Sequence, residues 1–159
     1  MAVTLVWLLR VALALATLTL PTRAQAQLSP DWFGIWNLDV SRSTFVGQRP
    51  YARGTWKVER GPMDQIVMTY HQVGVRGGVT HMEWKGQFDG TDRRMHGPDA
   101  VVTYAYTAIG PRELELVVKV DGRRAAQARV VLEGDTVTAT TENATASGLV
   151  TTVTVYRKR

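Results

Sequence analysis

Three histidines and one glutamate are the side chains in this sequence best suited to metal or acid–base chemistry. The histidines are His71, His81 and His96, and Glu83 lies two positions after the second of them. Neutral imidazole nitrogens and carboxylate oxygens suit zinc or copper, and the same groups can carry protons in an enzyme. The chain has no cysteine, which excludes a thiolate metal site, an iron–sulfur cluster, a cysteine nucleophile and a disulfide framework.

The alternation of side chains around these histidines favours a surface position for them. The strands that hold them are expected to pair with Val73 opposite Val79. In that register His71 faces His81 on the neighbouring strand. Their face also carries Lys85 and other polar residues, whereas the opposite face is apolar. We therefore expect these side chains to point to solvent and assign them no metal-ligating role.

No other catalytic pattern stands out. None of the four serines in residues 27–159 lies in Gly-x-Ser-x-Gly or at a recognised spacing from a histidine. There is no His-Glu-x-x-His motif, phosphate loop or Rossmann glycine pattern. His96 precedes Gly97 and Pro98, where we expect a loop. We assign no catalytic residue, metal or cofactor. The alternative is an isomerase- or hydrolase-type enzyme that uses the histidines with Glu83, because a barrel can assemble residues far apart in sequence.

Large apolar and aromatic side chains at alternating positions offer a second kind of chemistry. They occupy the face opposite to the polar one, so they are expected to point into the interior. Such residues either fill a core or line a pocket for an apolar ligand, and tyrosine and tryptophan need a polar partner when buried. The candidate ligand-binding set is Trp36, Met68, Tyr70, Met82, Trp84, Phe88, Tyr104 and Tyr106.

The segments that must position these side chains are ten short runs with a period of two. Valine, threonine and tyrosine are frequent in them, and glycine–proline or aspartate–glycine pairs separate them, as is typical of β-strands and their turns. No segment carries a convincing helical stripe, although residues 40–45 can form one short turn. The expected strands are 34–39, 54–60, 65–73, 79–88, 91–95, 101–108, 113–120, 124–132, 136–141 and 148–157.

Consecutive strands share one apolar face, which indicates how they pair. Strands joined by short connections form an antiparallel up-and-down meander, and such a meander avoids exposed edges by closing on itself. We therefore predict an all-β fold of about eight to ten strands closed into a barrel. The matching positions are Leu114, Leu116 and Val118 with Val130, Ala128 and Ala126, and then Val130 and Leu132 with Ala139 and Val137.

The first 26 residues have the features of an export signal. An apolar run at 11–20 is followed by Ala24 and Ala26, small residues at the −3 and −1 positions before Gln27. The run is shorter than the roughly 20 residues that span a bilayer. We expect cleavage after Ala26 and release to a periplasm or the outside medium, with an uncleaved anchor as the alternative. Residues 27–159 then form a single domain of ordinary globular composition, since the chain is 45% hydrophobic and 21% charged.

The charge is too mild to indicate a polyanionic partner. Cleavage removes two of the 19 basic residues, Arg10 and Arg23, and leaves 17 basic and 14 acidic residues, so the net charge falls from +5 to +3. The remaining arginine doublets stand at turns, and no basic stripe with stacking aromatics is present. We expect a monomer with no nucleic-acid partner and no membrane span after cleavage.

The expected first strand carries the pattern Gly34-x-Trp36-x-Leu38-Asp39-x-x-Arg42-Ser43-x-Phe45. Its Gly-x-Trp resembles the opening of lipocalins, in which the tryptophan closes the bottom of the barrel. The whole pattern is similar to a group of small secreted bacterial proteins with a lipocalin-like barrel, most of them uncharacterised. Residues 88–92, 97–98 and 153–158 match this group as well, whereas Arg93-Arg94 stands where the group has Tyr-Pro.

The resemblance implies a lipocalin-like (calycin-type) barrel and an exported protein, and it brings no catalytic residues with it. Combined with the inward aromatic side chains, it favours a protein that holds a small apolar or amphipathic ligand inside the barrel. The barrel enzyme described above and an envelope structural module with a filled core are the alternatives, because a fold does not determine a function.

Overall fold

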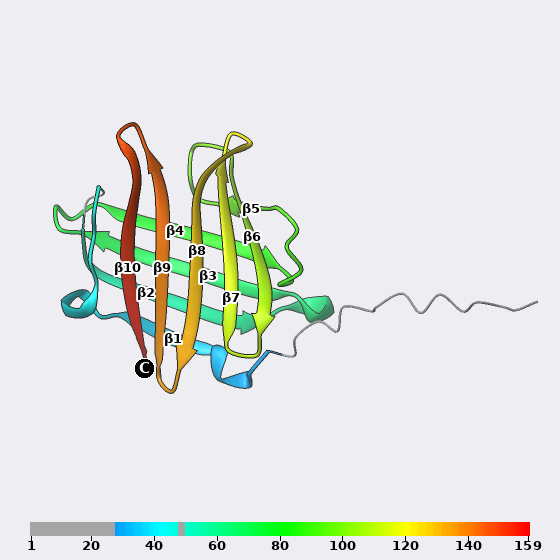
Figure 1. The fold of residues 1–159 in the computed structure, drawn as a ribbon. Coiled ribbons are helices and arrows are strands. Elements are labelled where there is room, and N and C mark those ends of the chain that lie inside the picture. The colour runs from blue at the N-terminus through cyan, green and yellow to red at the C-terminus, as the bar shows by residue number, and fades with distance from the viewer. Residues whose placement is uncertain (1–27, 48–49) are drawn as a thin grey trace, which may run out of the picture.

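Ten antiparallel strands make up most of the computed structural model, which describes residues 28–47 and 50–159 (Figure 1). Three short 3-10 helices accompany them, namely η1 (Pro30–Trp32), η2 (Val40–Arg42) and η3 (Pro62–Asp64). The export signal expected at 1–26 lies outside the described residues. The strands are β1 (Gly34–Leu38), β2 (Tyr51–Arg60), β3 (Ile66–Gly74), β4 (Val79–Gly86), β5 (Arg93–His96), β6 (Val102–Gly110), β7 (Glu113–Val120), β8 (Arg123–Glu133), β9 (Thr136–Thr145) and β10 (Gly148–Lys158).

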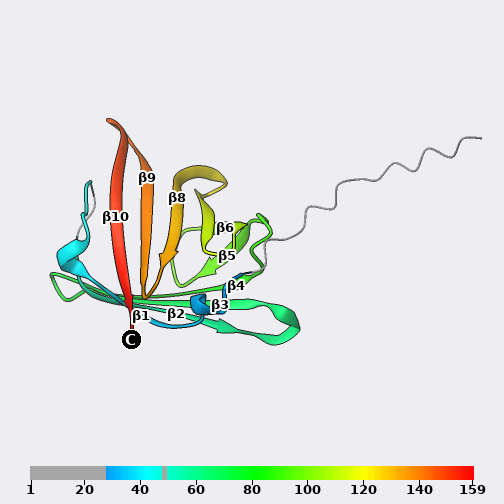
Figure 2. The same cartoon turned by 60° about the horizontal axis from the view of Figure 1, so that its bottom comes forward.

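The strands close into a barrel in which each strand pairs with the next in sequence and β1 pairs with β10. Trp36 lies opposite Lys158, and Leu38 lies opposite Tyr156, in the pair that closes the ring. Strands β2, β3 and β4 form one wall, and β8, β9 and β10 cross it as the facing wall (Figures 1 and 2). The all-β meander predicted from the sequence is confirmed.

The registers predicted from side-chain alternation are also confirmed. Val73 lies opposite Val79, which places His71 opposite His81. Strands β7, β8 and β9 pair as expected too, so that their apolar side chains point to one side of the sheet. These pairs are Leu114 with Val130, Leu116 with Ala128, Val118 with Ala126, Val130 with Ala139, and Leu132 with Val137.

The prediction that His96 lies in a loop was wrong. His96 is the last residue of β5 and lies opposite Glu83 on β4. The strand continues this far because Met95 is fully buried, with 1% of its surface exposed, and alternation then directs His96 outward. The strand ends at Gly97, which has a φ of 116° and approaches the His81 carbonyl oxygen so closely that a Cβ would collide with it.

Two strands extend at one end by three or four residues beyond the range that the sequence suggested. β2 begins at Tyr51 instead of residue 54, and β9 continues to Thr145 instead of ending at residue 141. The β9 extension pairs with residues 148–151 at the start of β10, and β2 begins at Tyr51 opposite Gly74, one residue beyond the expected end of β3. The short turn expected at 40–45 is the helix η2, and the Asp39 side chain accepts a hydrogen bond from the Arg42 backbone N–H at its start.

Tryptophan side chains close one end of the barrel. The Trp56 ring packs against the Trp32 ring, with centroids 6.3 Å apart, and against the Trp36 ring, with centroids 6.4 Å apart. The Trp36 indole N–H donates to the Trp32 carbonyl at 3.0 Å, and the Trp32 indole donates to the Pro111 carbonyl at 3.0 Å. This end is therefore filled by a core in which the Trp32 and Trp36 indole groups are both bonded. Among the described residues, no helix has the length and apolar character that crossing a bilayer requires.

Candidate functional site

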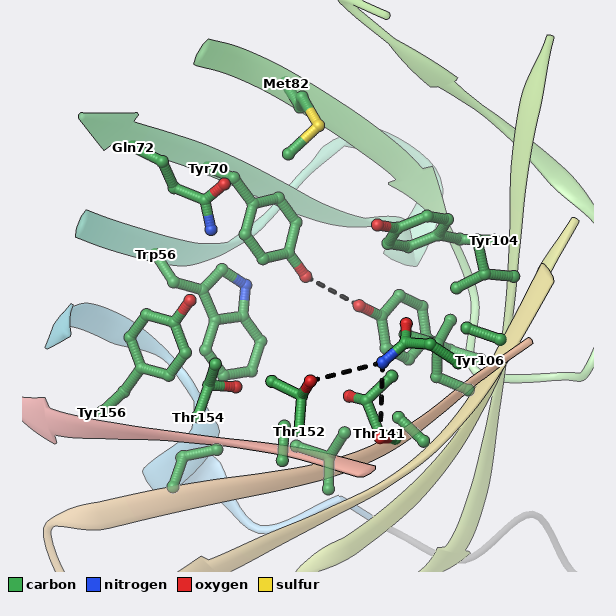
Figure 3. Close-up of a pocket in the computed structure, with 18 of the residues that line it drawn as sticks. Trp56, Tyr70, Gln72, Met82, Tyr104, Tyr106, Thr141, Thr152, Thr154 and Tyr156 are labelled. Atoms are coloured by element: carbon green, nitrogen blue, oxygen red, sulfur yellow. Dashed lines mark hydrogen bonds between the residues drawn. The ribbon is translucent and has the colours of Figure 1, made fainter. Parts of the chain in front are cut away.

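A cavity of about 240 Å³ lies inside the barrel, and Trp56 of the tryptophan cluster is part of its lining (Figure 3). All five tyrosines of the chain line it. They reach it from four strands, because each occupies an inward position of its strand: Tyr51 on β2, Tyr70 on β3, Tyr104 and Tyr106 on β6, and Tyr156 on β10. The cavity is therefore the place where the tyrosines of this chain are concentrated.

One wall of the cavity is aromatic and internally bonded. Trp56 and Tyr70 lie opposite each other on β2 and β3, and their rings stack with centroids 5.9 Å apart and planes 6° apart. The Tyr70 and Tyr106 hydroxyl groups share a hydrogen bond of 2.7 Å, which links this wall to β6 (Figure 3). Tyr104 then packs edge-on against Tyr106, with ring centroids 6.0 Å apart. The contacts hold these rings in fixed positions around the cavity.

The facing wall is built from small side chains. Its members on β8 and β9 include Ala126, Ala128 and Ala139, and threonines from β9 and β10 continue it, among them Thr152 and Thr154. Strands β8 to β10 are rich in alanine, valine and threonine, so they cannot fill the space that the large rings opposite leave free. The cavity follows from this mismatch between large side chains on one wall and small ones on the other.

Hydrogen bonds join some of the polar side chains at the cavity, but not all of them. The Asn143 side-chain amide donates to the Thr152 hydroxyl at 3.4 Å and to the Thr141 carbonyl at 3.5 Å. Within the described part of the chain, the Trp56 indole N–H and the Gln72 side-chain carbonyl oxygen are buried without a hydrogen-bond partner. Both residues line the cavity.

The cavity lining carries no charge. Among the described residues that line it, none is a lysine, arginine, histidine, aspartate or glutamate. Burial raises the pKa of Tyr104 and that of Tyr156 to about 12, in the second case against a smaller opposing effect of the Gln72 side chain. Burial also raises the pKa of Tyr70 well above its usual value, and the neighbouring Tyr106 adds to this effect. These phenols are therefore neutral at physiological pH.

The raised tyrosine pKa values predict that the protein loses stability between about pH 10 and 12. In this range tyrosines of the unfolded chain ionise near pH 10 while those in the cavity keep their protons. The unfolded state then binds fewer protons than the folded state, so the free energy of unfolding falls as the pH rises. Urea denaturation at pH 9 and pH 11 measures the fall, and absorbance at 295 nm reports phenolate. Full ionisation near pH 10 in a protein that circular dichroism shows to be folded would contradict the prediction.

Four of the eight candidate residues predicted from the sequence line the cavity, and four do not. Tyr70, Met82, Tyr104 and Tyr106 line it. The other four lie at other levels along the barrel axis and pack in the core beside the cavity. Phe88 has 5% of its surface exposed, and the remaining three have 0%, namely Trp36, Met68 and Trp84.

Sequence reasoning missed eight of the eleven polar and aromatic residues that line the cavity. Trp56 was detectable, because the pairing of β2 with β3 places it directly opposite Tyr70. Tyr156 was detectable as well, because side-chain alternation along β10 directs it inward. The threonines and Asn143 were not detectable, because inward polar residues do not stand out in an apolar pattern. The missed residues are Tyr51, Trp56, Gln72, Thr141, Asn143, Thr152, Thr154 and Tyr156.

The histidines lie on the outside of the barrel, on β3, β4 and β5. His71 and His81 face each other across the strand pair with ring centroids 6.2 Å apart, and His96 lies opposite Glu83. The Glu83 carboxylate is bonded to Lys85 at 2.7 Å. In residues 28–47 and 50–159, no group of three histidine, aspartate or glutamate side chains is arranged to hold a metal ion.

No protein-family model matches this chain, and no curated protein matches it. Solved structures match its fold. The abundant heat-soluble (SAHS) protein of Ramazzottius varieornatus has a TM-score of 0.58 and 14% identity, over 84% of this chain and 99% of its own. The wild-type fluorescent protein UnaG has a TM-score of 0.53 and 18% identity, over 80% of this chain and 97% of its own.

The ileal bile acid-binding protein of zebrafish, solved with cholic acid, is a third structural match. It has a TM-score of 0.50 and 13% identity, over 81% of this chain and 99% of its own. At these identities the likeness shows the fold alone. The lipocalin-like (calycin-type) barrel expected from the sequence is thereby confirmed, while the similarity to one group of secreted bacterial proteins stays a prediction.

Proposed function

We propose that this chain is an exported protein that binds one small apolar or amphipathic molecule inside its barrel. The observation that carries the proposal is the cavity of about 240 Å³, which is lined by five tyrosines and Trp56 and by small alanine, valine and threonine side chains. The volume is slightly below the roughly 300–1,000 Å³ of pockets for drug-sized ligands, so the ligand is a small one. Burial of its apolar surface, at about 25 cal/mol per Å², provides the affinity.

The structural neighbours support this function. The zebrafish protein was solved with cholic acid, and its name identifies it as a bile acid-binding protein. A barrel of this fold therefore accommodates a small molecule. The cavity in the present chain also favours binding over the alternative of an envelope module, because a filled core would leave no such space.

The remaining parts of the proposal come from the sequence. The apolar run at 11–20 and the small residues Ala24 and Ala26 support cleavage before Gln27 and a location in a periplasm or the outside medium. We further propose that the protein is a monomer without a nucleic-acid partner, since its net charge of +3 after cleavage is mild and not concentrated in a stripe.

Mass spectrometry of the exported protein, purified from its host, tests this function directly. Under denaturing conditions we expect a polypeptide that begins at Gln27. Under native conditions we expect a heavier species that carries one organic molecule. Titration with Prodan, a neutral naphthalene dye whose emission shifts to the blue in apolar surroundings, provides a second measurement for a ligand lost on purification. A bare native protein that also leaves the emission of Prodan unchanged would contradict the proposal.

A further inference from the structure

The indole nitrogens of the described tryptophans differ in one respect. In three of the four described tryptophans the indole N–H donates to a backbone carbonyl. Trp32 donates to Pro111 at 3.0 Å, Trp36 donates to Trp32 at 3.0 Å, and Trp84 donates to Tyr104 at 3.1 Å. Trp56 is equally buried, with 3% of its surface exposed, but its indole N–H has no partner among the described residues. This unpaired donor belongs to a residue that lines the cavity.

An unpaired acceptor lies on the same wall. Gln72 is an inward residue of β3 with 9% of its surface exposed, and its side-chain carbonyl oxygen has no partner within the described chain. Buried polar side-chain atoms nearly always have a hydrogen-bond partner. A donor and an acceptor that both lack one, in the lining of one cavity, therefore indicate positions that a bound molecule satisfies.

The two groups are close enough to bind the same small molecule. Trp56 lies directly opposite Tyr70 in the β2–β3 pair, and Gln72 is two positions beyond Tyr70 on β3. Such diagonal neighbours have Cα atoms about 7–8 Å apart, within the span of one bicyclic ring system. Figure 3 shows Trp56, Tyr70 and Gln72 together at the aromatic side of the cavity.

The uncharged lining limits the ligand further. No charged side chain of the described residues lines the cavity, so an ionic ligand would lose its hydration without gaining a counter-ion. The tyrosine hydroxyls are neutral and two of them are bonded to each other, those of Tyr70 and Tyr106. A charged group is therefore disfavoured at every side of this cavity.

We infer that the ligand is a neutral molecule with an apolar ring system and an amide-type group, which accepts a hydrogen bond from Trp56 Nε1 and donates one to Gln72 Oε1. This inference rests on the proposed function, and it names the chemical class of the ligand. An amide offers its acceptor and its donor on two different atoms without charge, whereas a hydroxyl offers both on one oxygen, so an amide is better suited to two separate protein atoms. A purely apolar ligand of the same shape would leave both protein atoms unpaired.

Three naphthalene derivatives of similar shape test this inference by isothermal titration calorimetry at neutral pH. The probes are 2-naphthamide, which is neutral and carries both polar functions, 2-naphthoate, which is an anion, and 2-isopropylnaphthalene, which has neither function. We expect 2-naphthamide to bind at least about tenfold more tightly than either of the others, because only it pairs both buried atoms without introducing a charge.

Two variants connect the preference to the named atoms. Gln72→Leu and Trp56→Phe are each expected to weaken the binding of 2-naphthamide about tenfold and to change that of 2-isopropylnaphthalene less than twofold. Gln87→Leu removes the same amide from an exposed position on the outside of the barrel and is the matched control, with no expected change. Circular dichroism checks that each variant is folded.

The outcomes separate this inference from the proposed function. If 2-naphthoate or 2-isopropylnaphthalene binds as tightly as 2-naphthamide, the cavity is a binding site but the inferred ligand class is wrong. The same conclusion follows if both folded variants bind 2-naphthamide as well as the unaltered protein does. If none of the three probes binds, Prodan emission is unchanged and the native protein carries no ligand, the proposed function itself fails.

Discussion

Replacing Ala139 with phenylalanine is expected to weaken small-molecule binding at least about a hundredfold, or roughly 2.7 kcal/mol. Ala139 lies on β9 in the wall of small residues, opposite Val130 on β8 and Thr154 on β10, which also line the cavity. A phenyl ring at this position projects into the cavity of about 240 Å³ and fills a large part of it. The barrel can accommodate the ring because the added atoms enter free space and displace few packed neighbours. Binding of Prodan or of the co-purified ligand measures the effect.

Thr140→Phe is the matched control for this prediction. Thr140 is the next residue on the same strand, and alternation directs its side chain to the exposed outside of the barrel. We expect the control to bind like the unaltered protein, while both variants keep the β-sheet signal in circular dichroism. Equal affinities for Ala139→Phe and the unaltered protein would mean that the ligand binds elsewhere, and that the cavity is not the site.

Replacing Trp84 with alanine is expected to lower the free energy of unfolding by about 3–5 kcal/mol, the range typical of a buried tryptophan replaced by alanine. Trp84 has 0% of its surface exposed. Its indole N–H donates to the Tyr104 carbonyl at 3.1 Å, and its ring packs against Phe88 and Tyr106 with centroids 5.9 and 5.0 Å apart. The truncation therefore removes apolar burial, leaves a void and frees a backbone carbonyl.

Urea denaturation followed by circular dichroism measures this loss, and Lys85→Ala provides the comparison. Lys85 follows Trp84 on β4 but is exposed, and its ion pair with Glu83 is a surface contact. A change within about 0.5 kcal/mol is expected for Lys85→Ala, since exposed ion pairs contribute little. A loss below 1 kcal/mol in Trp84→Ala would show that the core rearranges to fill the void.

The fold was largely predictable because its determinants are local. Side-chain alternation and turn residues specify each hairpin separately, so pairing Val73 with Val79 or Leu116 with Ala128 requires only two neighbouring segments. All adjacent strands of the barrel follow each other in sequence, except for β1 and β10. The end of β5 was predicted wrongly, since its short pairings depend on the close approach of Gly97 to β4.

The candidate site was only half predictable because a cavity is not a local property. Alternation shows that Trp36 and Tyr70 both point inward, but it does not show the level of each along the barrel axis. Trp36 therefore lies in the core, while Tyr70 lines the cavity. The empty space also depends on how large residues such as Tyr70 face small ones such as Ala128 across the barrel, which only the closed structure reveals.

The pairing of β1 with β10 also has a consequence for the order of events during folding. All other neighbours can meet soon after they are synthesised, but Trp36 and Lys158 come from the first and the last strand of the barrel. Contacts of such sequence separation have a large loop-closure entropy and slow the folding of all-β proteins. Until the last strand arrives, β1 and β9 each present an unpaired edge, and such edges promote association between chains. A chain that lacks its final strand would therefore be a species prone to aggregate, with neither a closed ring nor a closed cavity.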